Sequence, residues 1–189
     1  MAEPSELVRH VFDEHVKNYG DPDLQFQFHR GYSNLFNRLD VFLWKPTDKI
    51  PMTTFSTMGM SDIPMKNVVH RCEIHWTIRG ELSEDENSDS AAFLANLAEY
   101  PFKKDVALDH WHIIQNLTIP KFQKCASLLF HPSFTSDGWN QIVWKTHTIK
   151  ILNLVPITNE ENQIALHSGV NTMLDHLYES QTDIFSDRI

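Results

Sequence analysis

The chain has 189 residues, of which 41% are hydrophobic and 22% are charged, and this composition is typical of one soluble globular domain of ordinary size. Its formal net charge of -9 at pH 7 argues against a DNA- or RNA-binding protein, because phosphate binding requires clustered Lys and Arg side chains. A basic protein is a compatible partner, although an acidic surface that serves solubility alone is the simpler interpretation.

Other bulk features concern the compartment. No apolar run approaches the roughly 18 residues of a membrane span. Glu3 and Glu6 stand where a secretion signal would carry positive charge, and Cys72 and Cys125 form neither a CxxC motif nor a disulfide framework. We therefore expect a single domain over residues 1–189, located in the cytoplasm, with no membrane association.

The first third of the chain predicts one helix followed by strands. Apolar residues recur at helical spacing over residues 5–19, and Gly20 is a plausible helix end. Residues 24–29 alternate between apolar and polar side chains, which predicts an edge strand. A second alternating strand over residues 39–44 is closed by Pro46.

The clearest strand covers residues 68–79. One of its faces carries Val68, His70, Cys72, Ile74, Trp76 and Ile78. The other carries Val69, Arg71, Glu73, His75, Thr77 and Arg79. Because side chains alternate across a strand, we expect the first face to be buried. Glu73 and Arg79 are then expected to be exposed or paired.

An acidic segment follows, and it is our first candidate for a partner-binding surface. Its carboxylates are Glu81, Glu84, Asp85, Glu86 and Asp89. Such a dense run of like charge repels itself and has little apolar surface to bury, so we expect a mobile, exposed loop. A helix should begin near residues 88–90 and end before Pro101. A solvated face without function is the alternative.

The turn before the clearest strand is the second candidate surface. It contains Met58, Gly59, Met60, Ser61 and Asp62. Exposed methionines suit adaptable apolar binding, so Met58, Met60 and Asp62 could contact a partner. A tight structural turn fixed by Gly59 is the simpler interpretation.

The second half predicts more strands and a terminal helix. Strands are expected near residues 108–114, 125–130, 139–145 and 148–155. The last helix opens with Thr158 and Glu161, whose side chains form the signature of a capping box. Blocks of strands with helices at the start, middle and end predict an α+β fold: a mixed, largely antiparallel β-sheet covered by helices.

The segment DHWHII, residues 109–114, raises the question of a metal site. In an extended strand His110 and His112 would lie on one face and could supply two metal ligands. The sequence offers no HExxH, cysteine pair or EF-hand loop to complete such a site. A metal-dependent hydrolase using His110 and His112 is therefore kept only as the alternative function, and ordinary sheet histidines are favoured.

Other chemistry has little support. Cys72 lies on the apolar face of its strand, where a thiol is normally inert, and neither cysteine has a partner at a known catalytic spacing. No GxSxG, GxGxxG or phosphate-binding loop is present. The sequence therefore indicates neither a catalytic residue nor a cofactor.

Several segments, read together, resemble the Suppressor of fused domain family. Residues 57–62 resemble its "G-hydrophobic-S-D" turn, and residues 71–78 its "ELTFRL"-like strand with Glu73 at the acidic position. Residues 92–102 resemble the helix ending in "LARY-x-F". Residues 149–158 resemble the "FLQIVPLT" strand that leads into the capped terminal helix. The closing residues 182–188 resemble the "D-x-x-R" segment, with Arg188 as its arginine.

The resemblance spans roughly residues 35–189 in the same order and assigns several motif positions. These positions are Gly59, Ser61, Asp62, Glu73, His112 and Arg188. His112 takes the place of a histidine that is structural in the family, while Trp111 departs from the small or polar residue usual there.

The resemblance also implies a function. It implies an α+β fold and a non-catalytic role in binding other proteins. Animal members carry a second domain, whereas short single-domain members resemble a bacterial branch that includes immunity proteins paired with secreted toxins, often nucleases. By analogy, we expect an immunity or regulatory protein with a basic toxin as its partner.

Overall fold

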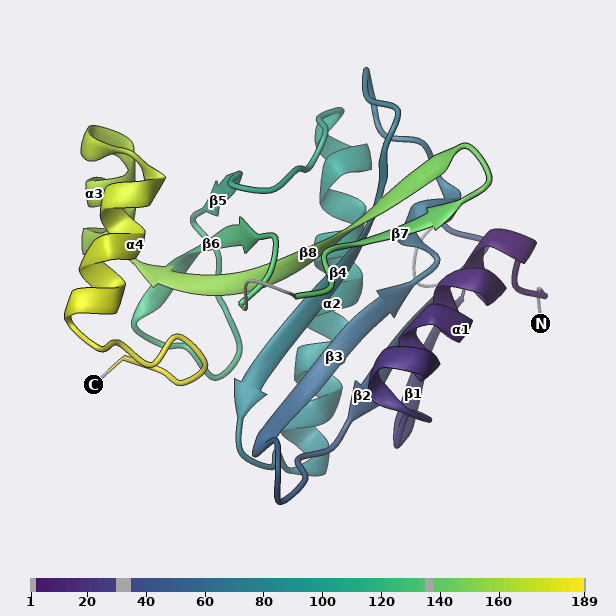
Figure 1. Cartoon of the computed structure of the whole chain (residues 1–189), viewed down its shortest axis with the longest axis horizontal. Coiled ribbons are helices and arrows are strands. Elements are labelled where there is room, and N and C mark those ends of the chain that lie inside the picture. Colours follow the sequence, from purple (N-terminus) through teal and green to yellow (C-terminus); the bar gives the residue numbers. More distant parts are fainter. Residues whose placement is uncertain (1–2, 30–34, 135–137, 189) are drawn as a thin grey trace.

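A computed structural model describes residues 3–29, 35–134 and 138–188. Within these residues the chain forms one eight-stranded sheet in the order β1-β2-β3-β4-β8-β6-β5, and β7 pairs with β8 (Figure 1). The strands are β1 Leu24–His29, β2 Arg38–Trp44, β3 Met52–Met58, β4 Arg71–Arg79, β5 Ile113–Gln115, β6 Cys125–His131, β7 Gln141–Trp144 and β8 His147–Thr158. The helices are α1 Glu6–Tyr19, the short 3-10 helix η1 Met60–Asp62, α2 Glu84–Lys104, α3 Asn159–Ser168 and α4 Val170–Glu179.

The sheet is mixed, as predicted. The central strands β4 and β8 run parallel, and the other strand pairs of the described chain are antiparallel. β1 lies at one end of the strand order, so the expected edge strand is confirmed. The α+β fold class is confirmed as well.

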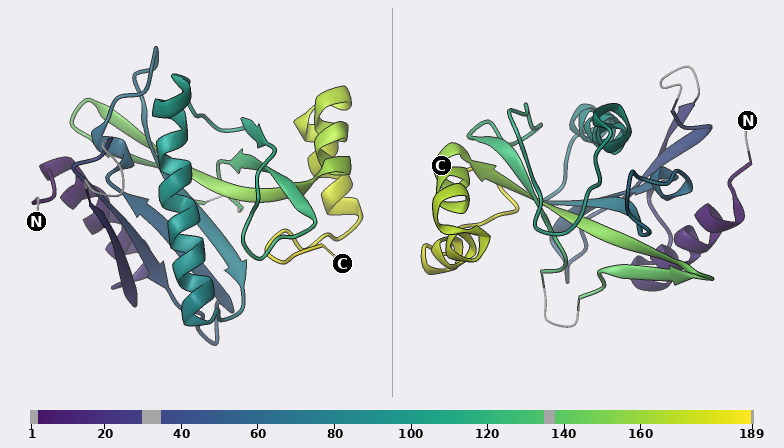
Figure 2. Two further views of the ribbon diagram at one scale, coloured as in Figure 1. Left: turned by 180° about the vertical axis from the view of Figure 1, so that it is seen from behind. Right: turned by 90° about the horizontal axis from the view of Figure 1, so that it is seen from above.

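The helices cover the sheet on both faces. α2 packs on one face and α1 on the other, while α3 and α4 cover the far end of β8 (Figure 2). α2 contributes Ala91, Leu94 and Ala98 to the main core cluster, and α1 contributes Leu7, Val8 and Val11 to a second cluster. β4 and β8 therefore lie in the middle of three layers. None of the described helices is long and apolar enough to cross a bilayer.

β4 shows the consequence of this layering. Ile74 and Trp76 are fully buried, which confirms the predicted core face. The opposite face is not exposed: Glu73 and His75 are also buried, because α1 and η1 cover them. Exposure of Glu73 is thus wrong, and its carboxylate is hydrogen-bonded to neutral donors in the interior. Arg79 is exposed and ion-paired with Asp183, as expected.

The expected acidic loop is wrong. Residues from Glu84 onward form the first turns of α2 rather than a mobile loop. The Ser83 hydroxyl accepts the Glu86 backbone N–H, and the Glu86 carboxylate accepts the Ser83 backbone N–H. This capping box starts the helix several residues earlier than predicted, and its acidic first turn suits the positive end of the helix dipole. The helix also continues through Pro101.

In the second half of the chain, one strand is shorter than predicted and the terminal helix is divided. The strand expected over 108–114 is present only as β5, and His110–Trp111 form a turn in which Trp111 has a φ of 72°. The terminal helix begins with the predicted capping box at Thr158, but Gly169 divides it into α3 and α4. The strands near 125–130, 139–145 and 148–155 are confirmed as β6, β7 and β8.

Candidate functional site

The acidic surface is made of Glu81, Glu84, Asp85, Glu86 and Asp89. Glu81 and Glu86 have basic neighbours, at 3.9 Å from Lys45 and 2.6 Å from Lys121. The other three are exposed and make no ion pair within the described part of the chain. Three carboxylates of the acidic surface therefore remain open to a partner.

Glu86 has a different role from its neighbours. The hydrogen bond from Lys121 and the backbone hydrogen bond from Ser83 lower the pKa of Glu86 to about 2. It therefore stays charged at physiological pH and is engaged in capping α2. Capping of α2 explains why an acidic residue stands at position 86. It does not explain why all the neighbouring positions are acidic as well.

The second candidate surface is not what the sequence suggested. Met58 and Met60 are each 1% exposed, so the prediction that they are exposed partner contacts is wrong. The turn bends inward because Gly59 has a φ of 121°, and a side chain there would meet the Arg38 carbonyl oxygen at 2.7 Å. Both methionines consequently pack into the two core clusters. Of the three residues proposed there, only Asp62 is exposed.

The buried carboxylate of Glu73 fixes this turn by accepting its hydrogen bonds. Its Oε1 accepts hydrogen bonds from the backbone N–H groups of Gly59 and Ser61, each 3.0 Å, and from the Ser61 hydroxyl, 2.6 Å. Its Oε2 accepts from the Thr57 hydroxyl at 2.7 Å. Burial raises the pKa of Glu73 to about 7 in spite of these four donors. The motif turn and Glu73 thus form one buried structural unit.

The same turn anchors α1. The hydroxyl of Ser5, which caps α1, donates to Asp62 Oδ1 at 2.6 Å. Arg71 donates to the backbone carbonyls of Ser61 and Asp62 at 3.1 and 3.0 Å. Asp62 is therefore committed to an intramolecular contact, and its role as a partner contact stays a prediction.

A buried histidine pair lies between α1 and the sheet. His15 Nε2 lies 2.7 Å from His75 Nε2 and 2.9 Å from the Ser56 hydroxyl, and its Nδ1–H donates to the Val11 carbonyl at 2.7 Å. Burial lowers the pKa of His15 to about 4 and that of His75 well below its ordinary value. The pair is neutral at pH 7 and joins α1 to β4. The sequence contains no signal for this pair, because nothing links His15 to His75 before the fold is known.

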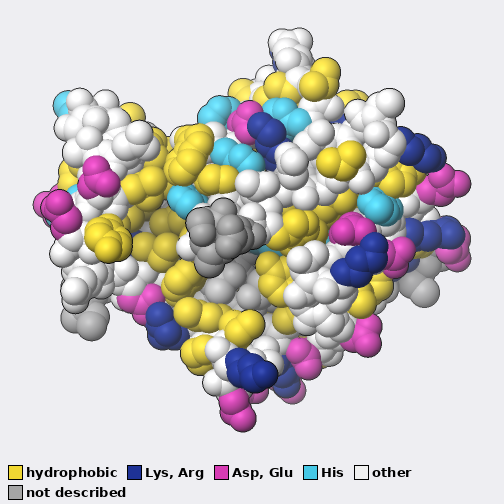
Figure 3. Space-filling view, viewed as in Figure 1, with side chains coloured by type: hydrophobic (Ala, Val, Ile, Leu, Met, Phe, Trp, Pro, Cys, Tyr) yellow, Lys and Arg dark blue, Asp and Glu magenta, His cyan; other side chains and the backbone are white. Residues whose placement is uncertain are grey.

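His110 and His112 do not share a strand face. His110 lies in the turn and its Nε2 is 3.0 Å from the Ile151 carbonyl, while His112 is exposed. The neighbouring Asp109 pairs with Lys150 at 2.5 Å. Figure 3 shows histidine, acidic and basic side chains gathered over the segment that joins α2 to β5. No three His, Cys, Asp or Glu side chains of the described residues are arranged to hold a metal ion.

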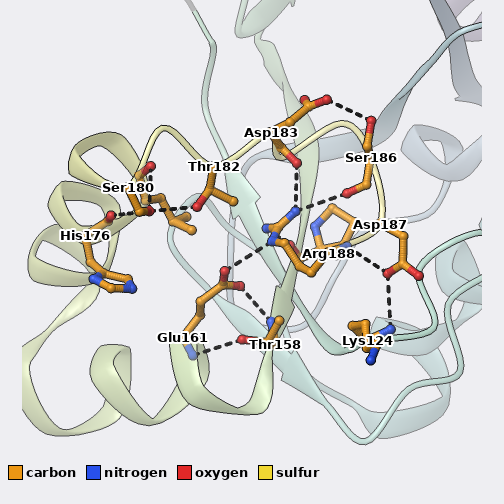
Figure 4. Close-up of polar contacts among 12 residues, drawn as sticks. Lys124, Thr158, Glu161, His176, Ser180, Thr182, Asp183, Ser186, Asp187 and Arg188 are labelled. Carbon is orange, nitrogen blue, oxygen red and sulfur yellow. Dashed lines mark hydrogen bonds and ion pairs between the residues drawn. The ribbon is translucent and has the colours of Figure 1, made fainter.

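The C-terminal segment is locked onto the body of the protein by Arg188. Its guanidinium donates to Glu161 Oε1 at 3.1 Å and to the backbone carbonyls of Pro156 and Asp183, each 2.9 Å (Figure 4). Asp187 accepts hydrogen bonds from the backbone N–H groups of Gln123 and Lys124, which come directly before β6. Glu161 also completes the capping box of α3. Arg188 is thus satisfied by acceptors from three segments, as a structural residue would be.

Comparison with known proteins now identifies the family. The family model described as Suppressor of fused protein (SUFU) matches residues 37–187, which is most of the chain. The chain belongs to the Suppressor of fused family. The match contains the turn at Gly59, the carboxylate Glu73 and the exposed His112, and it ends one residue before Arg188.

Solved structures support the same fold. A suppressor of fused homolog from Neisseria gonorrhoeae FA 1090 is 14% identical, with a TM-score of 0.67 over 96% of this chain and 94% of that one. The Sufu–Fu complex contains a chain that is 15% identical, with a TM-score of 0.64 over 94% of this chain and 83% of that one. Drosophila Suppressor of Fused is 14% identical, with a TM-score of 0.65, and this chain covers 94% of its own length but only 46% of the Drosophila chain. No curated protein gave a match to the sequence.

Among the Suppressor of fused motif positions, most are structural in this chain. Gly59, Ser61 and Glu73 form the buried turn, and Arg188 fastens the C-terminal segment. The acidic surface lies outside these positions and shares no contact with the Glu73 turn. These motif residues therefore serve the fold, and three carboxylates of the acidic surface are exposed.

Proposed function

We propose that this protein is a non-catalytic, protein-binding member of the Suppressor of fused family that binds a basic partner. By analogy with the short bacterial members, we further propose that the partner is a toxin, for example a nuclease, which the protein neutralises in the cytoplasm. The single observation that carries the proposal is a group of three exposed carboxylates, Glu84, Asp85 and Asp89, that form no ion pair with any described residue, on a chain of net charge -9.

The placement of these carboxylates supports recognition of a basic protein. They stand on the first turns of a well-capped helix, so their backbone positions are fixed before a partner arrives. Complementary charge mainly accelerates encounter, and it can cover the basic surface that a nuclease uses for phosphate groups. The protein recorded in the Sufu–Fu complex also binds a protein.

The experiment measures association kinetics with the partner at low and at high ionic strength. The test variant neutralises Glu84, Asp85 and Asp89 together to their amides and leaves Glu86 intact, because Glu86 caps α2. We expect slower association at low salt and a much smaller difference at high salt, because exposed charges are screened over about 8 to 10 Å at ordinary ionic strength.

A matched control carries the same change in net charge elsewhere. It neutralises three exposed carboxylates of α3 and α4, namely Glu160, Asp175 and Glu179. If both triple variants slow association equally, net charge alone is responsible and the α2 surface has no special role. If neither alters the rate at low salt, the acidic surface only confers solubility.

A further inference from the structure

A groove lies between α1 and the strands β1 and β2, where α1 passes in front of these strands in Figure 1. It has a volume of about 350 Å³, which is within the range of a site for one side chain or a small molecule. Its lining combines two aromatic rings with two acidic and two basic side chains: Phe12, Phe42, Asp13, Asp40, Arg9 and Arg38. The groove is separate from the acidic surface at the start of α2.

Asp40 is the unusual residue of this groove. Its side chain is buried, with only 2% of the residue exposed, and Oδ2 accepts from Arg38 Nε at 2.6 Å. Its other oxygen, Oδ1, is buried and has no hydrogen-bond partner among the described residues. Buried polar atoms in native proteins are nearly always satisfied, and an unsatisfied acceptor is costly. Within the described part of the chain this oxygen therefore has no donor, and a bound group could supply one.

The walls of the groove favour a particular kind of donor. The rings of Phe12 and Phe42 lie with their centroids 5.0 Å apart, so they offer apolar surface and aromatic faces together. Aromatic faces attract cations, most often the guanidinium of arginine, while apolar surface suits an aliphatic stem. Asp13 is exposed and adds a negative charge to the lining. The charges of Arg38 and Asp40 offset each other, and Arg9 is ion-paired with Glu3 at 3.7 Å. The attraction for a guanidinium therefore comes from Asp40 Oδ1, the two rings and Asp13.

We propose that this groove binds an arginine side chain of a partner protein, with the guanidinium donating to Asp40 Oδ1. A planar guanidinium has five N–H donors and tolerates desolvation better than an ammonium group. This arginine would be one contact of the basic partner, and the existence of that partner rests on the proposed function. The groove itself can be tested without the partner.

The experiment is an NMR titration of the ¹⁵N-labelled protein with N-acetyl-arginine amide, up to millimolar concentration. N-acetyl-norleucine amide serves as the probe with an aliphatic stem and no charge. We expect saturable shifts of backbone signals in α1 and β2 with the arginine probe and much weaker effects with the norleucine probe. The Asp40→Asn variant should bind the arginine probe about tenfold more weakly or worse, because a charge-assisted hydrogen bond is lost.

Two variants keep the test decisive. Asp48→Asn makes the same charge change at an exposed residue outside the groove and should bind like the wild type. If Asp40→Asn does not fold, Phe12→Leu removes an aromatic face while keeping apolar bulk, and it should weaken the arginine probe but not the norleucine probe.

The proposal is overturned if the wild type shows no saturable binding, if Asp40→Asn binds the arginine probe as well as the wild type, or if both probes bind equally. A successful arginine titration stands even if no toxin partner is found. If a toxin binds Asp40→Asn as tightly as it binds the wild type, the proposed function stands and the groove is not part of the toxin interface.

Discussion

The buried histidine pair makes the stability of this protein sensitive to acid in a way that can be calculated. His15 is fully buried, and burial lowers its pKa from 6.5 to about 4. In the unfolded chain the same imidazole takes up a proton as the pH falls through about 6.5. Between these two values the unfolded state binds more protons than the folded state, so the free energy of unfolding decreases as the pH is lowered.

The magnitude follows from the two pKa values. One pKa unit corresponds to about 1.4 kcal/mol, so His15 alone should remove about 3 kcal/mol of stability between pH 7 and pH 4. His75, whose pKa is also lowered by burial, adds a loss of the same sign. Glu73 acts oppositely: its raised pKa of about 7 means that the folded state holds a proton that the unfolded state releases above about 4.5. The stabilising effect of Glu73 is therefore gained as the pH falls.

The assay separates these contributions by comparing variants at each pH. Urea unfolding of the wild type and of His15→Gln is measured from pH 7 to pH 4, and Glu73 titrates in both proteins. As the pH is lowered from 7 to 4, the free energy of unfolding of His15→Gln should rise by about 3 kcal/mol relative to that of the wild type. The reason is that glutamine cannot take up the proton that destabilises the wild type.

The control is His167→Gln. His167 also bonds the carbonyl four residues before it in a helix, at 2.8 Å from Gln163, but it is exposed. This variant should follow the wild type across the whole range. A difference between the wild type and His15→Gln that does not change with pH would refute the burial argument for the pair.

Three further predictions test the core and the turn. Ile74→Ala should lower the free energy of unfolding by about 2 to 5 kcal/mol, since Ile74 is fully buried; an unchanged denaturation midpoint would contradict its placement. Glu73→Ala leaves the buried amide donors of Gly59 and Ser61 unpaired and should cost about 3 kcal/mol or more, whereas Glu73→Gln keeps one acceptor oxygen and should cost about 1 kcal/mol; equal losses in urea unfolding would show that the hydrogen bonds are unimportant. Gly59→Ala should cost more than about 1 kcal/mol, because its φ is 121° and the added carbon would lie 2.7 Å from the Arg38 carbonyl; a thermal midpoint like that of the wild type would contradict this.

Local patterns in the sequence were sufficient for much of the fold. Alternation over residues 71–79 located β4 and its core face, and the Thr158–Glu161 capping box located the start of α3. The same capping signature is present at Ser83 and Glu86, but the prediction of a loop rested on the density of negative charge alone. Repulsion among exposed carboxylates is weak in water, and the helix dipole favours them at this end.

Long-range packing could not be inferred from the same patterns. Glu73 and His75 were placed on the solvent side of β4 because alternation identifies two faces but not what covers the second one. α1, which comes from the far end of the chain, covers that face. The inward bend at Gly59 likewise buries Met58 and Met60, although the presence of a turn there was predicted.

The proposed function is tested by calorimetric titration of this protein with the product of the neighbouring coding region, at two salt concentrations. We predict a stoichiometric complex with a basic, toxin-like protein whose affinity falls as salt is raised and whose toxic activity is lost in the complex. Absence of binding to a basic neighbouring product, or binding that is indifferent both to salt and to neutralisation of Glu84, Asp85 and Asp89, would contradict it.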